Sequence, residues 1–178
     1  MYLNIVGEDL LFLLAATLFL AVVGWAWRKA KPYQLPEPLP SWFKIWFLSV
    51  QIGGGLIPFI VLLWAVWQGS DASGASRSDH RAIAVLASYF VMLALQILSE
   101  IATLRWFHSV VWVMVPYLYL PYRIWQLYEG IFILAFDTNF VWVQNLLLGE
   151  IVLWTLNYAL DLSQLPRLLH WEVATDEI

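Results

Sequence analysis

The chain has 178 residues, of which 62% are hydrophobic, 17% aromatic and only 12% charged, with a formal net charge of −4. A soluble domain rarely reaches such values, so the composition indicates a membrane protein. Scattered basic residues and a small negative charge argue against nucleic acid as a partner, and the absence of cysteine excludes disulfides, thiolate metal sites and cysteine nucleophiles.

The first apolar segment lies near the N-terminus, where a secretory signal peptide would also lie. Its polarity is opposite to that of a signal peptide, because Glu8 and Asp9 precede the apolar core and a basic run at 28–31 follows it. We therefore expect a retained membrane helix whose N-terminus lies outside.

Five segments have the ~18–20 apolar-dominated residues that are needed to cross a ~30 Å hydrocarbon core. They cover about residues 10–27, 42–67, 82–107, 110–136 and 140–160. The prediction is an all-α, polytopic integral membrane helix bundle of five transmembrane helices, in which residues 1–178 form a single membrane domain. Residues 161–178 are expected to form a short tail at the membrane interface.

The basic residues are unevenly divided between the two ends of these segments. The first loop, with Lys44 just beyond it, lies on the same side as Arg105 and Arg167, whereas Arg77 and Arg81 lie on the other. The positive-inside rule then favours an outer N-terminus and an inner C-terminus. We expect a bacterial inner membrane or a related energy-transducing membrane such as the thylakoid.

The second segment contains "SVQIGGGLIPFIV", a stretch that is unusual for a spanning helix. Pro58 has no N–H, so the carbonyl of Gly54 loses its helical partner, and the helix is expected to be kinked or broken at Gly53–Pro58. Close helix packing around a kink is one interpretation. A discontinuous helix that lines a substrate or ion site, or a flat bay for a pigment, quinone or lipid tail, remain alternatives.

The fourth segment carries two prolines, Pro116 and Pro121. Each removes a helical hydrogen bond, so this helix is expected to be kinked at both positions. The alternative is a re-entrant pair of short helices, which would move the C-terminal tail to the other side of the membrane.

Polar residues in four of the segments fall at similar depths when each helical residue is given ~1.5 Å. Polar groups in hydrocarbon are costly, so each one is a candidate for function. The candidate binding residues of this midplane cluster are Gln51, Gly54, Gln96, Glu100, Arg123 and Glu150.

Arg123 is always ionised and needs an anion. We therefore predict a contact between Arg123 and Glu150, direct or through one water. Glu100 is then left without a cation, and we expect it to donate a hydrogen bond to the freed carbonyl of Gly54.

No motif indicates catalysis, a metal or a nucleotide. The three histidines, His80, His108 and His170, are scattered and have no ligand spacing. The sequence also lacks a G-x-S-x-G elbow, an H-E-x-x-H pair, a P-loop and a G-x-G-x-x-G turn. We predict no metal site and no nucleotide cofactor, and we regard a lipid, a quinone or a pigment as the kinds of bound molecule that fit.

The function most consistent with these features is that of a small, non-catalytic accessory, assembly or scaffold subunit. It would act through helix contacts within the membrane, with lipids and other membrane proteins or its own copies as partners. The alternative is a transporter of a small solute, an ion or protons that uses Glu100, Arg123 and Glu150. A third class is an intramembrane enzyme acting on lipid or isoprenoid. A water-filled cavity that reaches Glu100 or Glu150 would favour transport, and a closed, internally satisfied layer would favour a scaffold.

Overall fold

A computed structural model describes residues 2–27, 41–71, 77–107, 111–135 and 140–169, and every element within these ranges is helical. The helices are α1 (Tyr2–Ala26), α2 (Ser41–Gln51), η1 (Ile52–Leu56), α3 (Ile57–Asp71), α4 (Arg77–Phe107), α5 (Val111–Leu134) and α6 (Val141–Leu169). The prediction of an all-α bundle is confirmed for these residues.

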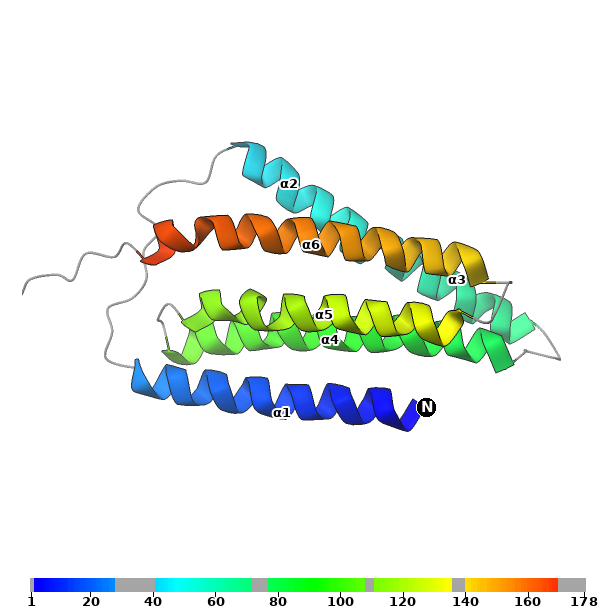
Figure 1. Cartoon of the computed structure of the whole chain (residues 1–178), viewed down its shortest axis with the longest axis horizontal. Coiled ribbons are helices and arrows are strands. Elements are labelled where there is room, and N and C mark those ends of the chain that lie inside the picture. Colours follow the sequence, from blue (N-terminus) through cyan, green and yellow to red (C-terminus); the bar gives the residue numbers. More distant parts are fainter. Residues whose placement is uncertain (1, 28–40, 72–76, 108–110, 136–139, 170–178) are drawn as a thin grey trace, which may run out of the picture.

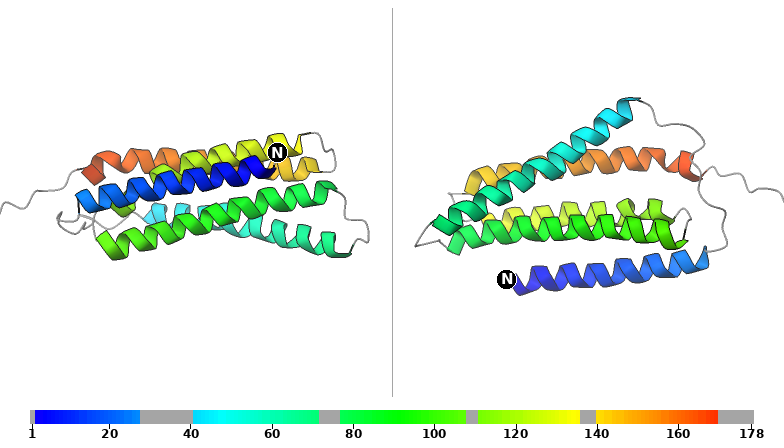
Figure 2. Two further views of the ribbon diagram at one scale, coloured as in Figure 1. Left: turned by 90° about the horizontal axis from the view of Figure 1, so that it is seen from below. Right: turned by 180° about the vertical axis from the view of Figure 1, so that it is seen from behind.

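The helices form an elongated bundle in which α4, α5 and α6 run side by side (Figures 1 and 2). Helix α5 contacts α1, α4 and α6, so it occupies the centre. Helix α1 lies along the outside of α4 and α5, and the α2–α3 segment crosses the bundle obliquely, with α2 diverging from the other helices (Figure 1). Two polar residues of α5, Arg123 and Gln126, are thereby enclosed by other helices.

Four helical segments of the described chain are long and apolar enough to cross a membrane, which indicates a membrane protein. They are Gly7–Ala26, Ser41–Trp67, His80–Trp106 and Val141–Gln164. The predicted count of five spans is not confirmed, because α5 is not among them. Its sequence contains two prolines, an arginine and several tyrosines, and a helix that other helices surround needs fewer apolar side chains than one that faces lipid.

Two clusters of buried apolar side chains hold the bundle together. The larger cluster joins α2, α4, α5 and α6 and includes Tyr89, Leu120 and Leu147. The smaller cluster joins α1 to α4 and α5 through Ala16 and Leu20. Most of the remaining apolar side chains of α1 are exposed, as a lipid-facing helix requires.

The chain stays helical through the glycine-rich stretch that was expected to be kinked or broken. Residues Ile52–Leu56 form a π-helix, in which the N–H of Ile57 donates to the carbonyl of Ile52. The helix is therefore not broken at Gly53–Pro58; its hydrogen-bond pattern changes locally and then returns to α-helical bonding in α3. Such π-helical turns occur often at functional sites and where a helix must shift its register.

The fourth predicted segment is one continuous helix, with Pro116 and Pro121 inside α5. The alternative of a re-entrant pair is therefore wrong. Four helices also run past the predicted segments: α1 begins at Tyr2, α3 ends at Asp71, α4 begins at Arg77, and α6 continues into the expected interfacial tail as far as Leu169. A helix can extend beyond the hydrocarbon core, so these lengths do not test where the spans end.

Candidate functional site: a buried polar layer around Arg123

Arg123 is the most deeply buried charged residue among the described residues, with an exposed fraction of 1%. It projects from the central helix α5, and its Nη2 donates a hydrogen bond of 2.5 Å to Oε1 of Gln96 on α4. The amide of Gln96 in turn donates to Oε1 of Glu100, at 2.9 Å, one turn further along α4. An arginine, an amide and a carboxyl group therefore form a chain of hydrogen bonds between α4 and α5.

The guanidinium group of Arg123 also lies over two aromatic rings. Its Cζ atom is 4.3 Å from the ring centroid of Trp154 on α6 and 5.6 Å from that of Tyr89 on α4. The face of an aromatic ring attracts a cation, and the attraction is larger where water is excluded. The two rings thus supply part of the stabilisation that an anion was expected to supply.

The carbonyl group of Gly54 accepts a hydrogen bond from the hydroxyl group of Tyr89. The same hydroxyl oxygen accepts a hydrogen bond of 3.0 Å from Nε1 of Trp154. The expected donor was Glu100, so that prediction is wrong: Tyr89 satisfies this carbonyl, and Glu100 is bonded to Gln96. An unsatisfied carbonyl in hydrocarbon would cost several kcal/mol, which explains why a buried tyrosine faces the π-helical turn.

Two of the three consecutive glycines let the π-helical turn approach α6 closely. A Cβ atom on Gly54 would lie 2.4 Å from Cζ2 of Trp154, and one on Gly53 would lie 2.9 Å from Cδ2 of Leu153. A Cβ atom on Gly55 would meet nothing within 4 Å. The glycine run therefore serves helix packing at Gly53 and Gly54, whereas Gly55 points away from the bundle.

Glu150, on α6 one turn before Trp154, has an exposed fraction of 4% and interacts electrostatically with Arg123 and Tyr89. The predicted contact between Arg123 and Glu150 is not a direct hydrogen bond from Arg123 Nε or Nη1 or to Glu150 Oε2, and a contact through one water stays a prediction. Arg123 Nε and Nη1 and Glu150 Oε2 have no hydrogen-bond partner among the described residues. Helices α4 and α6 both pack against α5, and the guanidinium bonds to the amide of Gln96 on α4.

Five of the six predicted site residues thus gather in one layer, together with two aromatic residues that the sequence prediction did not include. We call this set the Arg123 layer, and its members are Gly54, Tyr89, Gln96, Glu100, Arg123, Glu150 and Trp154. The sixth predicted residue, Gln51, lies apart from it and is exposed. Tyr89 could not be found from polarity at depth, because a tyrosine is usual in a membrane helix.

A second polar cluster joins α1 to the bundle. The carboxylate of Asp9 accepts hydrogen bonds from Ser88 Oγ (2.5 Å), Tyr122 Oη (2.8 Å) and Gln126 Nε2 (3.2 Å). The ring of Phe12 stacks on that of Tyr122, with centroids 3.9 Å apart. We call Asp9, Ser88, Tyr122 and Gln126 the Asp9 cluster. The sequence prediction missed it because Asp9 was interpreted only as an acidic residue outside the membrane.

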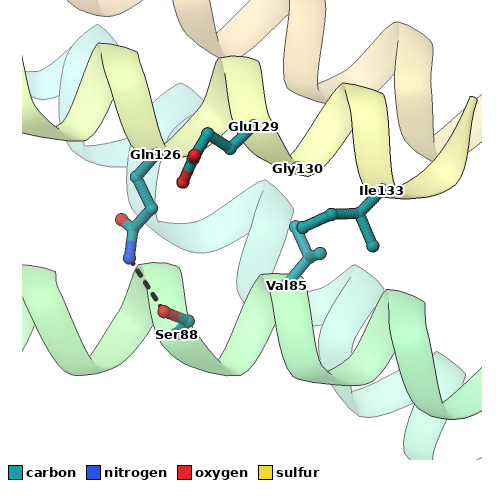
Figure 3. Close-up of a pocket in the computed structure, with 6 residues that line it drawn as sticks. All are labelled: Val85, Ser88, Gln126, Glu129, Gly130 and Ile133. Atoms are coloured by element: carbon teal, nitrogen blue, oxygen red, sulfur yellow. Dashed lines mark hydrogen bonds between the residues drawn. The ribbon is translucent and has the colours of Figure 1, made fainter. Parts of the chain in front are cut away.

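A small pocket lies beside the Asp9 cluster, between α4 and α5 (Figure 3). Its lining residues are Val85, Ser88, Gln126, Glu129, Gly130 and Ile133. Gln126 donates to Ser88 at 2.9 Å, and its own Oε1 has no hydrogen-bond partner among the described residues. Most of this lining is apolar, and nothing in it resembles a catalytic arrangement.

Metal ligands do not gather in the described part of the chain. No group of three or more histidine, aspartate or glutamate residues there could hold a metal ion. His80 is exposed on α4, and His108 and His170 lie outside the described residues. Comparison of the chain with protein-family models, with curated proteins and with solved structures finds no match.

Proposed function

We propose that this chain is a non-catalytic assembly or scaffold subunit of a membrane, and that the Arg123 layer holds its helices in a fixed arrangement. The observation that carries the proposal is the enclosure of that layer. Arg123, Gln96 and Glu150 have exposed fractions of 1%, 9% and 4%, and their polar neighbours come from η1, α4 and α6. A layer whose polar groups make contacts between helices stabilises a bundle and leaves few polar groups free to bind a solute.

The proposal includes α5 as a fifth membrane-spanning helix. Its 24 residues are enough to cross a ~30 Å core, and it lies between α4 and α6, both of which are apolar enough to span. With five spans, the chain has an outer N-terminus and an inner C-terminus in a bacterial inner membrane or a related energy-transducing membrane.

Transport of a small solute, ions or protons is the second candidate. The observation that favours it is the set of unpartnered atoms in the Arg123 layer, Arg123 Nε and Nη1 and Glu150 Oε2. Buried polar groups without partners are rare and are often completed by water or a ligand. An enzyme that acts on lipid would need at least two convergent carboxyl groups, or a histidine and an acid, that face one cleft, and the burial of Glu150 argues against its taking part in such a pair.

Flux through reconstituted vesicles separates the first two candidates. The full chain is placed in liposomes that contain a pH-sensitive dye, and an inward pH gradient is imposed with and without an ionophore that sets the membrane potential. A scaffold predicts a leak equal to that of empty liposomes. The matched variant Glu150→Gln keeps the size of the side chain and removes its charge. Flux by the wild-type chain that is lost in Glu150→Gln would replace the scaffold proposal by transport.

Recovery from native membranes tests the scaffold directly. The tagged chain is extracted in mild detergent, and the proteins and lipids that accompany it are quantified by mass spectrometry. A scaffold predicts at least one partner in a fixed ratio to the chain. Recovery of the chain alone as a monomer, or with partners whose ratios vary between preparations, would contradict the proposal.

A further inference from the structure

Gln51 is a polar side chain in a place where lipid is expected. It is the last residue of α2, and it lies within the candidate span Ser41–Trp67. At ~1.5 Å per residue, its Cα atom is roughly 15 Å from the start of that span, close to the middle of a ~30 Å core. Its side chain is exposed, and no residue of the described chain hydrogen-bonds to it.

The surroundings of Gln51 do not offer it a partner. Its neighbours one turn earlier on the helix surface, Phe47 and Leu48, are exposed and apolar. The side of α2 that faces the bundle is a different one: Val50 is buried there, and Trp46 Nε1 donates a hydrogen bond of 3.1 Å to Asn157 on α6. An amide that faces hydrocarbon loses its hydrogen bonds to water and gains none.

Gly55 lies one helical turn beyond Gln51 on the same side of the helix. A Cβ atom on Gly55 would meet nothing within 4 Å, so the backbone is open there to a helix from outside the chain. Small residues at a helix surface let two membrane helices approach closely, and an amide can then bond across the contact. An exposed amide and a half-buried glycine with open space beside it, on one side of a membrane helix, thus favour a helix–helix contact.

We propose that the side of α2 and η1 that carries Leu48, Gln51 and Gly55 is an interface between two copies of this chain. A carboxamide contains both a donor and an acceptor, so two Gln51 side chains related by a twofold axis satisfy each other with two hydrogen bonds. No other polar side chain is needed from the partner, which is why a second copy fits this surface. This inference rests on the part of the proposed function that places the chain in a membrane and has it act through helix contacts.

Disulfide cross-linking tests the interface, because the chain contains no cysteine of its own. Leu48→Cys places a thiol beside Gln51, and Leu14→Cys places one on the exposed side of α1 as the control; the two leucines have exposed fractions of 60% and 68%. Two differently tagged copies of each variant are co-expressed, and isolated membranes are treated with a mild oxidant. We expect Leu48→Cys to give a product at twice the 20.6 kDa mass of the chain that carries both tags, and Leu14→Cys to give none.

The role of the amide is tested by adding a second change to Leu48→Cys. Gln51→Leu removes the amide from a lipid-facing position and leaves the monomer fold intact, whereas Gln51→Asn keeps a shorter amide. We expect Gln51→Leu to weaken dimerisation about tenfold, the effect of one or two interhelical hydrogen bonds, and Gln51→Asn to weaken it less. Helical content measured by circular dichroism confirms that each variant is folded.

Four results would overturn the inference. The first three are no cross-link at Leu48→Cys, equal cross-linking at Leu14→Cys, and a cross-link that survives Gln51→Leu unchanged. A product that joins Leu48→Cys to a different protein would also overturn the pairing of two copies, yet it would leave the scaffold function standing. Failure of the scaffold function itself would appear separately, as Glu150-dependent flux in liposomes.

Discussion

Adding a single methyl group at Gly54 tests whether the glycine run exists for packing. The Cβ atom of Gly54→Ala would lie 2.4 Å from Cζ2 of Trp154 and 2.9 Å from its Cε2. Carbon atoms in contact prefer about 3.5–4.0 Å, so the indole ring or the π-helical turn must move by about 1 Å. Trp154 cannot move freely, because its Nε1 donates to Tyr89 and its ring lies against Arg123.

The expected loss of stability depends on how closely each new methyl group approaches its neighbours. Overpacking a well-packed core costs about 1–3 kcal/mol, and we expect Gly54→Ala to lower the free energy of unfolding by that amount. Gly53→Ala should cost less, since its Cβ would be 2.9 Å from Cδ2 of Leu153, the end of a flexible side chain. Gly55→Ala meets no atom within 4 Å, and alanine favours a helix over glycine by about 0.5–1 kcal/mol. The predicted order of stability is therefore Gly55→Ala above Gly53→Ala above Gly54→Ala.

The assay is reversible unfolding in mixed micelles, in which increasing dodecyl sulfate is followed by far-ultraviolet circular dichroism. Detergent is kept in excess so that each micelle holds one chain. Trp154→Phe removes the second ring of the indole. In a chain with Trp154→Phe, adding Gly54→Ala should lower the free energy of unfolding by at most half as much as it does in the wild-type chain. If Gly55→Ala is as destabilising as Gly54→Ala, the backbone freedom of glycine in the π-helix matters, and the argument from space beside Trp154 fails.

Three further outcomes are expected. Arg123→Leu should lower the free energy of unfolding by about 3 kcal/mol or more, because it leaves Glu150 buried without a cation. Adding Glu150→Leu should recover at least half of that loss in the same unfolding assay. No recovery would contradict a structural role for the two residues. Asp9→Ala leaves three donors without their acceptor and should cost about 1–3 kcal/mol, with faster hydrogen exchange in α1 than in α4; unchanged exchange would show that the Asp9 cluster does not hold α1. Gln34 and Ser73 lie outside the described residues. In intact cells, an impermeant thiol reagent should label a single cysteine at Ser73 and should not label one at Gln34. The reverse pattern would invert the proposed orientation.

The parts of the fold that the sequence predicts well depend on apolar length alone. Runs of apolar residues locate four helices, and the polar residues within them identify most of the Arg123 layer. The details that failed depend on side-chain geometry. Depth along a helix places Arg123 and Glu150 within roughly 5 Å of one level, yet it contains no information on which side chain the guanidinium bonds, and that side chain is Gln96.

The two aromatic residues of the Arg123 layer could not be identified from the sequence. Tyr89 and Trp154 are each amphipathic, and in an apolar helix neither differs from an ordinary lipid-facing side chain until the helices are packed. The glycine run was correctly identified as an unusual stretch. Its π-helical form could not be predicted, because it depends on the fit of Gly53 and Gly54 against α6, a helix that lies almost a hundred residues away in sequence.

The Asp9 cluster has a consequence for how the chain is made. The donors that Asp9 needs, Ser88, Tyr122 and Gln126, follow it by 79, 113 and 117 residues. At ~5–20 residues per second of synthesis, the last of them emerges about 6–23 s after Asp9. During that interval α1 is long and apolar enough to occupy the bilayer alone, while the carboxylate of Asp9 has only water and lipid headgroups to accept from. Helix α1 leaves the ribosome before α4 and α5 but docks after them, because α4 and α5 must meet before α1 has a place to bind.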